Sequence, residues 1–101
     1  MIDLIQEKKE DLKQLCVKYE IARMYVFGSA VSNNFHDQSD IDILISFKEI
    51  PFDRYTDNYF NLHAELELLF GRKVDLLTER SLNNKFLIDS INQTKELLYA
   101  A

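Results

Sequence analysis

Two aspartates, Asp40 and Asp42, are separated by a single isoleucine at the start of an apolar segment that ends at Phe47. Residues i and i+2 of a β-strand point to the same side, with Cα atoms about 6.5–7 Å apart, so both carboxylates can face one ligand. Like charges at that separation raise each other's pKa unless a cation neutralises them. Mg²⁺ is typically held by one or two carboxylates together with substrate phosphates. The pair therefore indicates either a divalent-metal site or the turn chemistry that Ser-Asp often supplies at the mouth of a strand.

A third carboxylate, Asp75, lies in the segment Val-Asp-Leu-Leu, where its neighbours on both sides are apolar. If its strand neighbours that of Asp40 and Asp42, all three carboxylates can meet at one metal centre. Each signal is commonplace when taken alone. Asp42 is the hardest of them to explain as turn chemistry, because isoleucines flank it within the strand. A buried carboxylate is costly unless it is paired or binds a metal.

Gly28 and Ser29 follow the apolar segment that ends at Phe27, and Gly28 is one of only two glycines in the chain. Glycine lets the backbone come close to a ligand. A serine at the start of a helix can cap that helix, or it can offer its hydroxyl to a phosphate beside the free backbone N–H groups. The turn is therefore either a phosphate-binding turn or simply a helix cap.

The spacing of apolar residues predicts helices and strands in alternation. Helices are expected at residues 3–19, 29–34, 53–70 and 82–98, and strands at residues 23–27, 40–47 and 72–78. Gly71 is well placed to cap the third of these helices. On the strand 40–47, one face carries Ile41, Ile43, Ile45 and Phe47, and the other carries Asp40, Asp42, Leu44 and Ser46. These elements predict an α/β or α+β fold with one small mixed sheet of about three strands.

The bulk composition narrows the function classes. A chain of 101 residues suits a single domain over 1–101, and its formal net charge of −5 argues against general binding to nucleic acid. The single cysteine, Cys16, excludes an internal disulfide, falls on an apolar helix stripe and suits a cytoplasmic location. The charged N-terminal segment is unlike a signal peptide, and no apolar run approaches the length that spans a membrane.

The combined pattern is more specific than its parts. A hydrophobic strand leads into Gly28-Ser29, ten residues intervene, Asp40-Ile41-Asp42 opens a second strand, and Asp75 lies in a third. This pattern resembles the minimal nucleotidyltransferases of the DNA polymerase beta superfamily. The resemblance rests on Phe27–Ser29, Ser39–Ile45 and Val74–Leu76 and covers nearly the whole chain. It implies a palm-like nucleotidyltransferase fold.

The resemblance also implies a role for each motif residue. Gly28 and Ser29 would bind the β- and γ-phosphates of a nucleoside triphosphate, expected to be ATP. Asp40 and Asp42 would bind two Mg²⁺ ions. Asp75 would help to hold the catalytic metal and would orient or deprotonate the acceptor hydroxyl. Two metals can stabilise the attacking and the leaving oxygens of an in-line displacement. The expected reaction releases pyrophosphate and attaches AMP to the acceptor.

The resemblance further suggests an acceptor. Many small members of the family are antitoxins paired with a helical HEPN-type toxin, and some transfer AMP to a tyrosine of that partner. The chain has no room for an added substrate domain, which favours a separate protein partner. Two alternatives remain open: an antitoxin that acts by binding alone, and a nucleotidyltransferase that modifies a small molecule.

One departure from the family pattern concerns positive charge. Many antitoxin members carry arginine and glycine soon after Gly-Ser, whereas this chain has Ala30–Phe35 there. A cation for the triphosphate would have to come from elsewhere in the chain. The candidates are Arg54, Arg72, Lys73 and Arg80.

Several aromatic and histidine residues are secondary candidates. The group Tyr55, Tyr59 and Phe60 could stack on an adenine, but its helical spacing favours a role in the core or in an interface. His36 lies in the loop between the two motifs and is expected to be solvated. His63 lies beside the apolar face of a helix and is expected to be packed rather than to bind a ligand.

Overall fold

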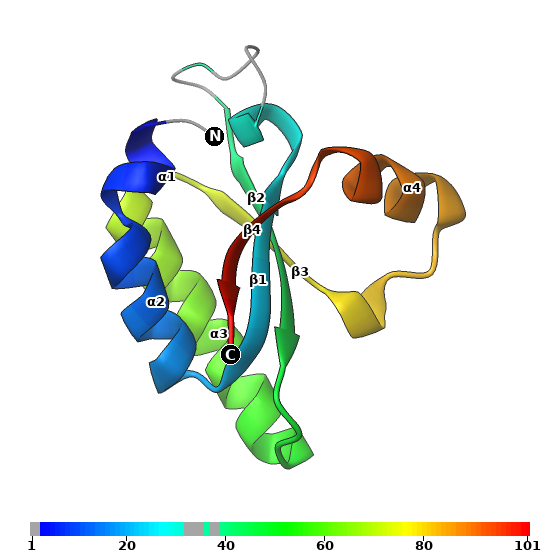
Figure 1. Ribbon diagram of the computed structural model, residues 1–101. Coiled ribbons are helices and arrows are strands. Elements are labelled where there is room, and N and C mark those ends of the chain that lie inside the picture. Colours follow the sequence, from blue (N-terminus) through cyan, green and yellow to red (C-terminus); the bar gives the residue numbers. More distant parts are fainter. Residues whose placement is uncertain (1–2, 32–35, 37–38) are drawn as a thin grey trace.

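The computed structural model describes residues 3–31, 36 and 39–101. Figure 1 shows helices and strands in alternation around one central sheet. The elements are α1 (Asp3–Glu7), α2 (Lys9–Lys18), β1 (Ile21–Phe27), η1 (Gly28–Val31), β2 (Ile41–Phe47), α3 (Phe52–Phe70), β3 (Val74–Thr78), η2 (Glu79–Ser81), α4 (Lys85–Thr94) and β4 (Glu96–Ala100). The predicted mixed α/β architecture is therefore confirmed.

The sheet has the strand order β3-β2-β1-β4. The strands β2 and β3 run parallel, whereas β1 is antiparallel to both of its neighbours. Parallel neighbours need a long crossover connection, and here α3 supplies it between β2 and β3. Asp42 and Asp75 are thereby placed on adjacent strands that point in the same direction.

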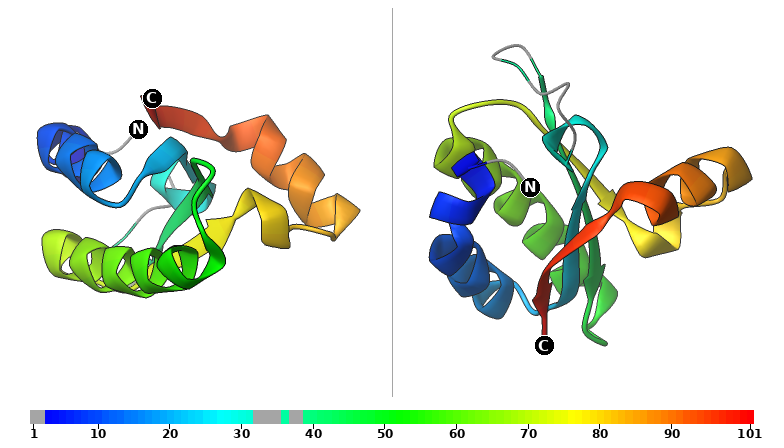
Figure 2. Two further views of the ribbon diagram at one scale, coloured as in Figure 1. Left: turned by 90° about the horizontal axis from the view of Figure 1, so that it is seen from below. Right: turned by 45° about the horizontal axis from the view of Figure 1, so that its top comes forward.

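The main core lies on one face of the sheet, between the strands and helices α2 and α3. Figure 2 shows α2 and α3 side by side on one side of the strands, with α4 on the opposite side. Cys16 is fully buried in this core, as the sequence indicated. Burial raises the pKa of its thiol to about 12, so it behaves as a small apolar side chain.

The alternation predicted for β2 is confirmed. Ile41, Ile43 and Ile45 are fully buried in the main core. Leu44 points to the opposite face, where it packs with Ile91 of α4. The residues that surround Asp42 therefore anchor its strand on both faces of the sheet, which fixes the direction of its side chain.

The N-terminal half of the molecule differs from the prediction at two helix boundaries. The expected helix at 3–19 is divided at Lys8, whose φ of −101° and ψ of 9° lie outside the helical range. Only part of the helix expected at 29–34 can be compared. Residues 28–31 form a short 3₁₀ helix, and residues 32–34 lie outside the described part of the chain.

The prediction of a final helix over 82–98 was wrong at both ends. Asn84 caps α4 by accepting hydrogen bonds from the N–H groups of Phe86 and Leu87. The helix ends at Thr94, and residues 96–100 form β4 on the open edge of β1. The sheet thus has four strands rather than about three, because the short run Glu-Leu-Leu-Tyr-Ala pairs with a strand at least 70 positions earlier.

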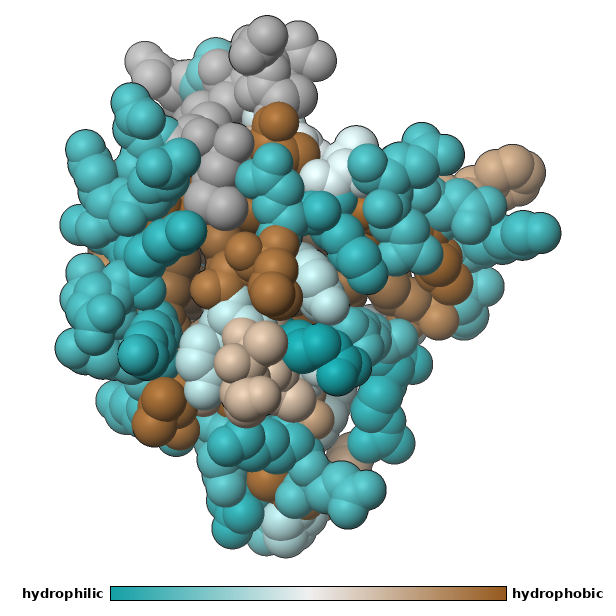
Figure 3. Space-filling model, in the orientation of Figure 1, coloured by the Kyte–Doolittle hydropathy of each residue, from teal (hydrophilic) through white to brown (hydrophobic). Residues whose placement is uncertain are grey.

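The edge strand β4 leaves some apolar surface exposed. Leu97 is 51% exposed. In the space-filling view, apolar residues gather over β4, between the hydrophilic surfaces of α2 and α4 (Figure 3). Among the described residues, no helix is long and apolar enough to cross a membrane.

Candidate active site

The sheet brings the predicted motifs together. Asp42 of β2 lies opposite Asp75 of β3 in the parallel register, and opposite Phe27 of β1 in the antiparallel register. Gly28 and Ser29 follow Phe27 directly in η1. The Gly-Ser turn, the Asp-Ile-Asp segment and the third carboxylate therefore meet at one end of the sheet, and β2 and β3 are the neighbours that this meeting requires.

Gly28 is required there for two reasons. Its φ is +71°, in the left-handed region that favours glycine. In addition, a Cβ at position 28 would overlap with Oδ2 of Asp42. The absence of a side chain at Gly28 therefore leaves room for the Asp42 carboxylate, a relationship that the sequence did not predict.

The Asp42 carboxyl group has an unusual environment. Burial, followed by a hydrogen bond with Asp75 and the charges of Asp75 and Asp40, raises its pKa to about 6. Asp42 therefore holds a proton more readily than an exposed aspartate does. A cation placed between such carboxylates would stabilise the ionised form.

These residues fit a hard divalent cation. Asp40, Asp42 and Asp75 offer carboxylate oxygens at one end of neighbouring strands, and Asp40 and Asp75 remain partly exposed. Within the described residues, the side chains are not gathered into a complete set of three ligands. Mg²⁺ sites are usually completed by substrate phosphates and water, so an incomplete protein set is compatible with such a site.

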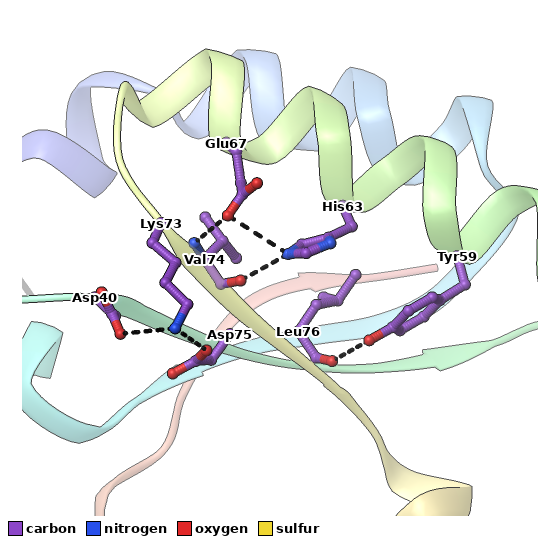
Figure 4. Close-up of polar contacts among 8 residues, drawn as sticks. All are labelled: Asp40, Tyr59, His63, Glu67, Lys73, Val74, Asp75 and Leu76. Atoms are coloured by element: carbon purple, nitrogen blue, oxygen red, sulfur yellow. Dashed lines mark hydrogen bonds and ion pairs between the residues drawn. The ribbon is translucent and has the colours of Figure 1, made fainter.

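Lys73 is the basic side chain that the structure places at the carboxylates. Its Nζ lies 3.8 Å from Oδ2 of Asp40 and 4.0 Å from Oδ1 of Asp75 (Figure 4). Alternation along the strand gives Lys73 the same face as Asp75. This signal was present in the sequence, although it did not distinguish Lys73 from the other basic candidates.

The other three basic candidates have partners other than the three carboxylates, although the partner of Arg72 directly precedes Asp40. Arg54 forms an ion pair with Glu20, with Nε 2.8 Å from Oε2. Arg72 donates to the carbonyl oxygen of Ser39 at 3.2 Å. The guanidinium of Arg80 lies over the ring of Tyr55, 5.7 Å from its centroid.

Helix α3 holds the strand of Asp75 along its outer edge (Figure 4). The Tyr59 hydroxyl donates to the Leu76 carbonyl at 2.6 Å, and His63 Nε2 lies 2.7 Å from the Val74 carbonyl oxygen. A carboxylate oxygen of Glu67 accepts a hydrogen bond from the Val74 N–H at 3.0 Å. His63 is packed, as expected. Its contact with the edge of β3 is a structural role that the helical spacing did not indicate.

A hollow opens beside the carboxylates. Asp42, Asp75 and Lys73 line it together with Tyr59 and His63 of α3 and Leu87 of α4. Leu87 is 41% exposed, so α4 borders the hollow without closing it. A protein segment can therefore reach the carboxylates from outside.

The comparisons with known proteins define the class. A family model described as polymerase beta, nucleotidyltransferase matches residues 10–101. The chain therefore belongs to the polymerase beta nucleotidyltransferase family, as the motifs predicted.

Relatives are similar over most of their length. A protein of Methanocaldococcus jannaschii, named as a candidate protein adenylyltransferase, is 32% identical over 97 residues, or 96% of this chain and 91% of the relative. The protein adenylyltransferase MntA of Thermococcus cleftensis is 36% identical over 72 residues, or 71% of this chain and 70% of the relative.

Solved structures share the fold. A structure of a candidate minimal nucleotidyltransferase matches with a TM-score of 0.76 at 28% identity and covers 94% of this chain and 95% of that one. A chain in a complex of a tri-AMPylated HEPN toxin from Shewanella oneidensis with an MNT antitoxin matches with a TM-score of 0.67 at 19% identity. That match covers 96% of this chain and 73% of the other, and it concerns the fold alone.

Proposed function

We propose that the protein is a protein adenylyltransferase that transfers AMP from ATP to a hydroxyl group of a HEPN-type toxin and so acts as its antitoxin. The observation that carries the proposal is the register that sets Asp42 opposite Asp75 beside the Gly28-Ser29 turn. Membership of the nucleotidyltransferase family supports the chemistry. The names of two relatives as protein adenylyltransferases support the acceptor class.

Each residue of the site has its own role in this reaction. The open backbone at Gly28 and the hydroxyl of Ser29 bind the triphosphate of ATP. Asp40 and Asp42 hold the metal ions, and Asp75 orients the acceptor hydroxyl and takes its proton. Two bound Mg²⁺ ions would supply charge stabilisation to the attacking and leaving oxygens. The partly exposed position of Asp75 gives an acceptor access to it.

A separate protein is the acceptor that best suits this shape. The described elements pack around one sheet, with the hollow open beside α4. We take residues 1–101 as a single catalytic domain. A solved complex that shares this fold contains an AMPylated HEPN toxin. We expect a tyrosine hydroxyl to receive AMP, and we expect the pair to act in the cytoplasm.

Transfer of AMP to the partner tests the proposal. A candidate HEPN-type toxin is incubated with the protein, ATP and Mg²⁺, and mass spectrometry then reports any AMP added to that candidate. Asp75→Asn should slow transfer by about 10²–10⁴-fold, since a positioned base contributes that much. It should retain much of the affinity for Mg–ATP, which depends mainly on Asp40, Asp42 and the Gly-Ser turn. Ser29→Ala should mainly weaken nucleotide binding.

The matched control is Asp57→Asn, since Asp57 is an exposed aspartate of α3. Asp57→Asn should transfer AMP at the wild-type rate. Equal modification by wild type and Asp75→Asn would refute the assignment of Asp75. If the complex silences the toxin while no AMP is added, the protein is an antitoxin that acts by binding alone.

A further inference from the structure

Lys73 belongs to a group of four charged residues on one face of the sheet. The N–H of Ile41 donates to the carbonyl of Lys73 at 3.1 Å, so β2 and β3 stay in register one position before β3 begins. In this register Asp40 is opposite Lys73, just as Asp42 is opposite Asp75. Residues two apart on a strand share a face. The three carboxylates and the one ammonium are therefore placed on the same face by the register.

The ammonium lies between two carboxylates from different strands. Its Nζ is within 3.8 Å of Asp40 and 4.0 Å of Asp75, and the Lys73 side chain is 68% exposed. A cation in this position reduces the repulsion among the carboxylates when no metal is bound. Its exposure also leaves the flexible lysine stem free to move when a divalent ion arrives.

The same residue can then serve the nucleotide. The Gly-Ser turn continues into Ala30 and Val31, which offer no charge to a triphosphate. The ammonium of Lys73 is already at the carboxylates, whereas Arg54 and Arg80 contact Glu20 and Tyr55. A lysine displaced by a metal ion remains at this site, where the phosphates of a bound ATP would offer it a new partner of negative charge.

We propose that Lys73 is a resident counter-ion that holds the metal-free carboxylates together, yields its place to Mg²⁺ and then binds the triphosphate. The binding of the triphosphate by Lys73 rests on the proposed function. The role of Lys73 in the metal-free protein rests only on its ion pairs with Asp40 and Asp75.

The role predicts opposite effects on two affinities. In Lys73→Met, calorimetry should show Mg²⁺ alone binding more tightly, on the order of threefold, because a positive charge about 4 Å from the carboxylates is gone. The same variant should bind Mg²⁺ with the non-hydrolysable ATP analogue AMP-PNP more weakly, also on the order of threefold or more. A lysine that only repels metal, or only fills space, would not produce this change of sign.

Lys18→Met is the matched control. Lys18 is also an exposed lysine, 60% accessible, that pairs with a carboxylate, with Nζ 3.3 Å from Glu65. It lies on α2, which packs on the other face of the sheet. Its removal should leave both affinities unchanged.

The role of Lys73 in the metal-free protein is tested separately, by thermal stability. In EDTA, Lys73→Met should lower the melting temperature, and the drop should shrink clearly in the background of Asp40→Asn, because the coupling partner is gone. Absence of this coupling, or a change of both affinities in the same direction, would overturn the role of Lys73. If the wild type binds Mg²⁺ but not AMP-PNP, the proposed function fails, while the coupling still decides the metal-free role.

Discussion

Asp42 links the stability of the metal-free protein to pH. Its pKa is raised from 3.8 to about 6 by burial and by Asp75 and Asp40. Between these values the folded protein binds more protons than the unfolded chain, so the free energy of unfolding falls as pH rises. The loss is complete only well above pH 6, where the carboxyl group is ionised in both states. As far as Asp42 contributes, the free energy of unfolding of the metal-free protein should therefore be higher near pH 4 than near pH 7.5.

We therefore expect Asp42→Asn to melt at a higher temperature than wild type near pH 7.5 in EDTA, and to show no such gain near pH 4. Thermal unfolding at both pH values measures the difference. Mg²⁺ should raise the melting temperature of the wild type and not that of Asp42→Asn, since bound ligand stabilises the folded state. A gain of equal size at both pH values would show that ionisation of Asp42 is not its cause.

Substitutions at the two glycines distinguish the effect of backbone strain from the effect of contact with the site. Gly28 and Gly71 have φ values of +71° and +64°. A Cβ at Gly28 would overlap with the Asp42 carboxylate, whereas a Cβ at Gly71 would meet nothing within 4 Å. Gly71→Ala should cost about 1 kcal/mol of unfolding free energy, from the left-handed backbone alone, and should leave metal affinity unchanged.

Gly28→Ala should cost more than Gly71→Ala, and it should also weaken Mg²⁺ binding because Asp42 must move. Chemical denaturation and calorimetry of the two variants make the comparison. Equal costs and equal metal affinities would show that the close approach of Gly28 to Asp42 has no consequence for the site.

At the level of elements, the sequence predicted the parts whose signals are local. The strand alternation of residues 41–45, the long helix α3 and its cap at Gly71 followed from period and composition, and each is found. Strand β4 did not follow, because five residues with four hydrophobic side chains fit a helix end as well as a strand. The open edge of β1 decides between them, and that edge is a tertiary feature.

The site shows the same division. The fixed period of a strand gave Asp40 and Asp42 a shared face. That Asp75 joins them depends on β3 lying beside β2, which the sequence left as a condition. The position of Lys73 depends on the register between β2 and β3, and the contact of Gly28 with Asp42 depends on the path of the chain after β1. The local pattern made Lys73 one of four candidate cations without selecting it, and it gave no sign of the contact of Gly28 with Asp42.

The contact of α3 with the edge of β3 gives an element-scale prediction. Tyr59 donates to the Leu76 carbonyl at 2.6 Å, one residue after Asp75. Tyr59→Phe removes this hydrogen bond and should lower the free energy of unfolding by about 1 kcal/mol. Tyr55→Phe is the control, because the Tyr55 ring packs against Phe47 and no hydrogen bond of its hydroxyl occurs within the described residues. Denaturant titration that shows equal losses would argue against a specific role for the edge contact.

At the scale of the whole molecule, the two faces of the sheet are covered unequally. Helices α2 and α3 bury one face, while α4 covers only part of the face that carries the carboxylates (Figure 2). Phe86 of α4 is 89% exposed, and its neighbour Leu87 lines the hollow with Asp42 and Asp75. An exposed aromatic residue beside an open site is a typical anchor for a protein partner.

We therefore expect the proposed toxin partner to dock over α4 and the carboxylates. Phe86→Ser should weaken the complex by on the order of tenfold or more, because truncation of a central aromatic anchor commonly costs that much. The control Leu68→Ser removes an equally exposed apolar side chain, 82% accessible, from α3 on the other side of the sheet. It should leave the complex intact. Titration with the purified partner measures the affinity of both variants. Because the net charge is −5, the wild type should also associate with a basic partner faster at low salt than at high salt. Equal affinity of the two variants would place the interface elsewhere on the molecule.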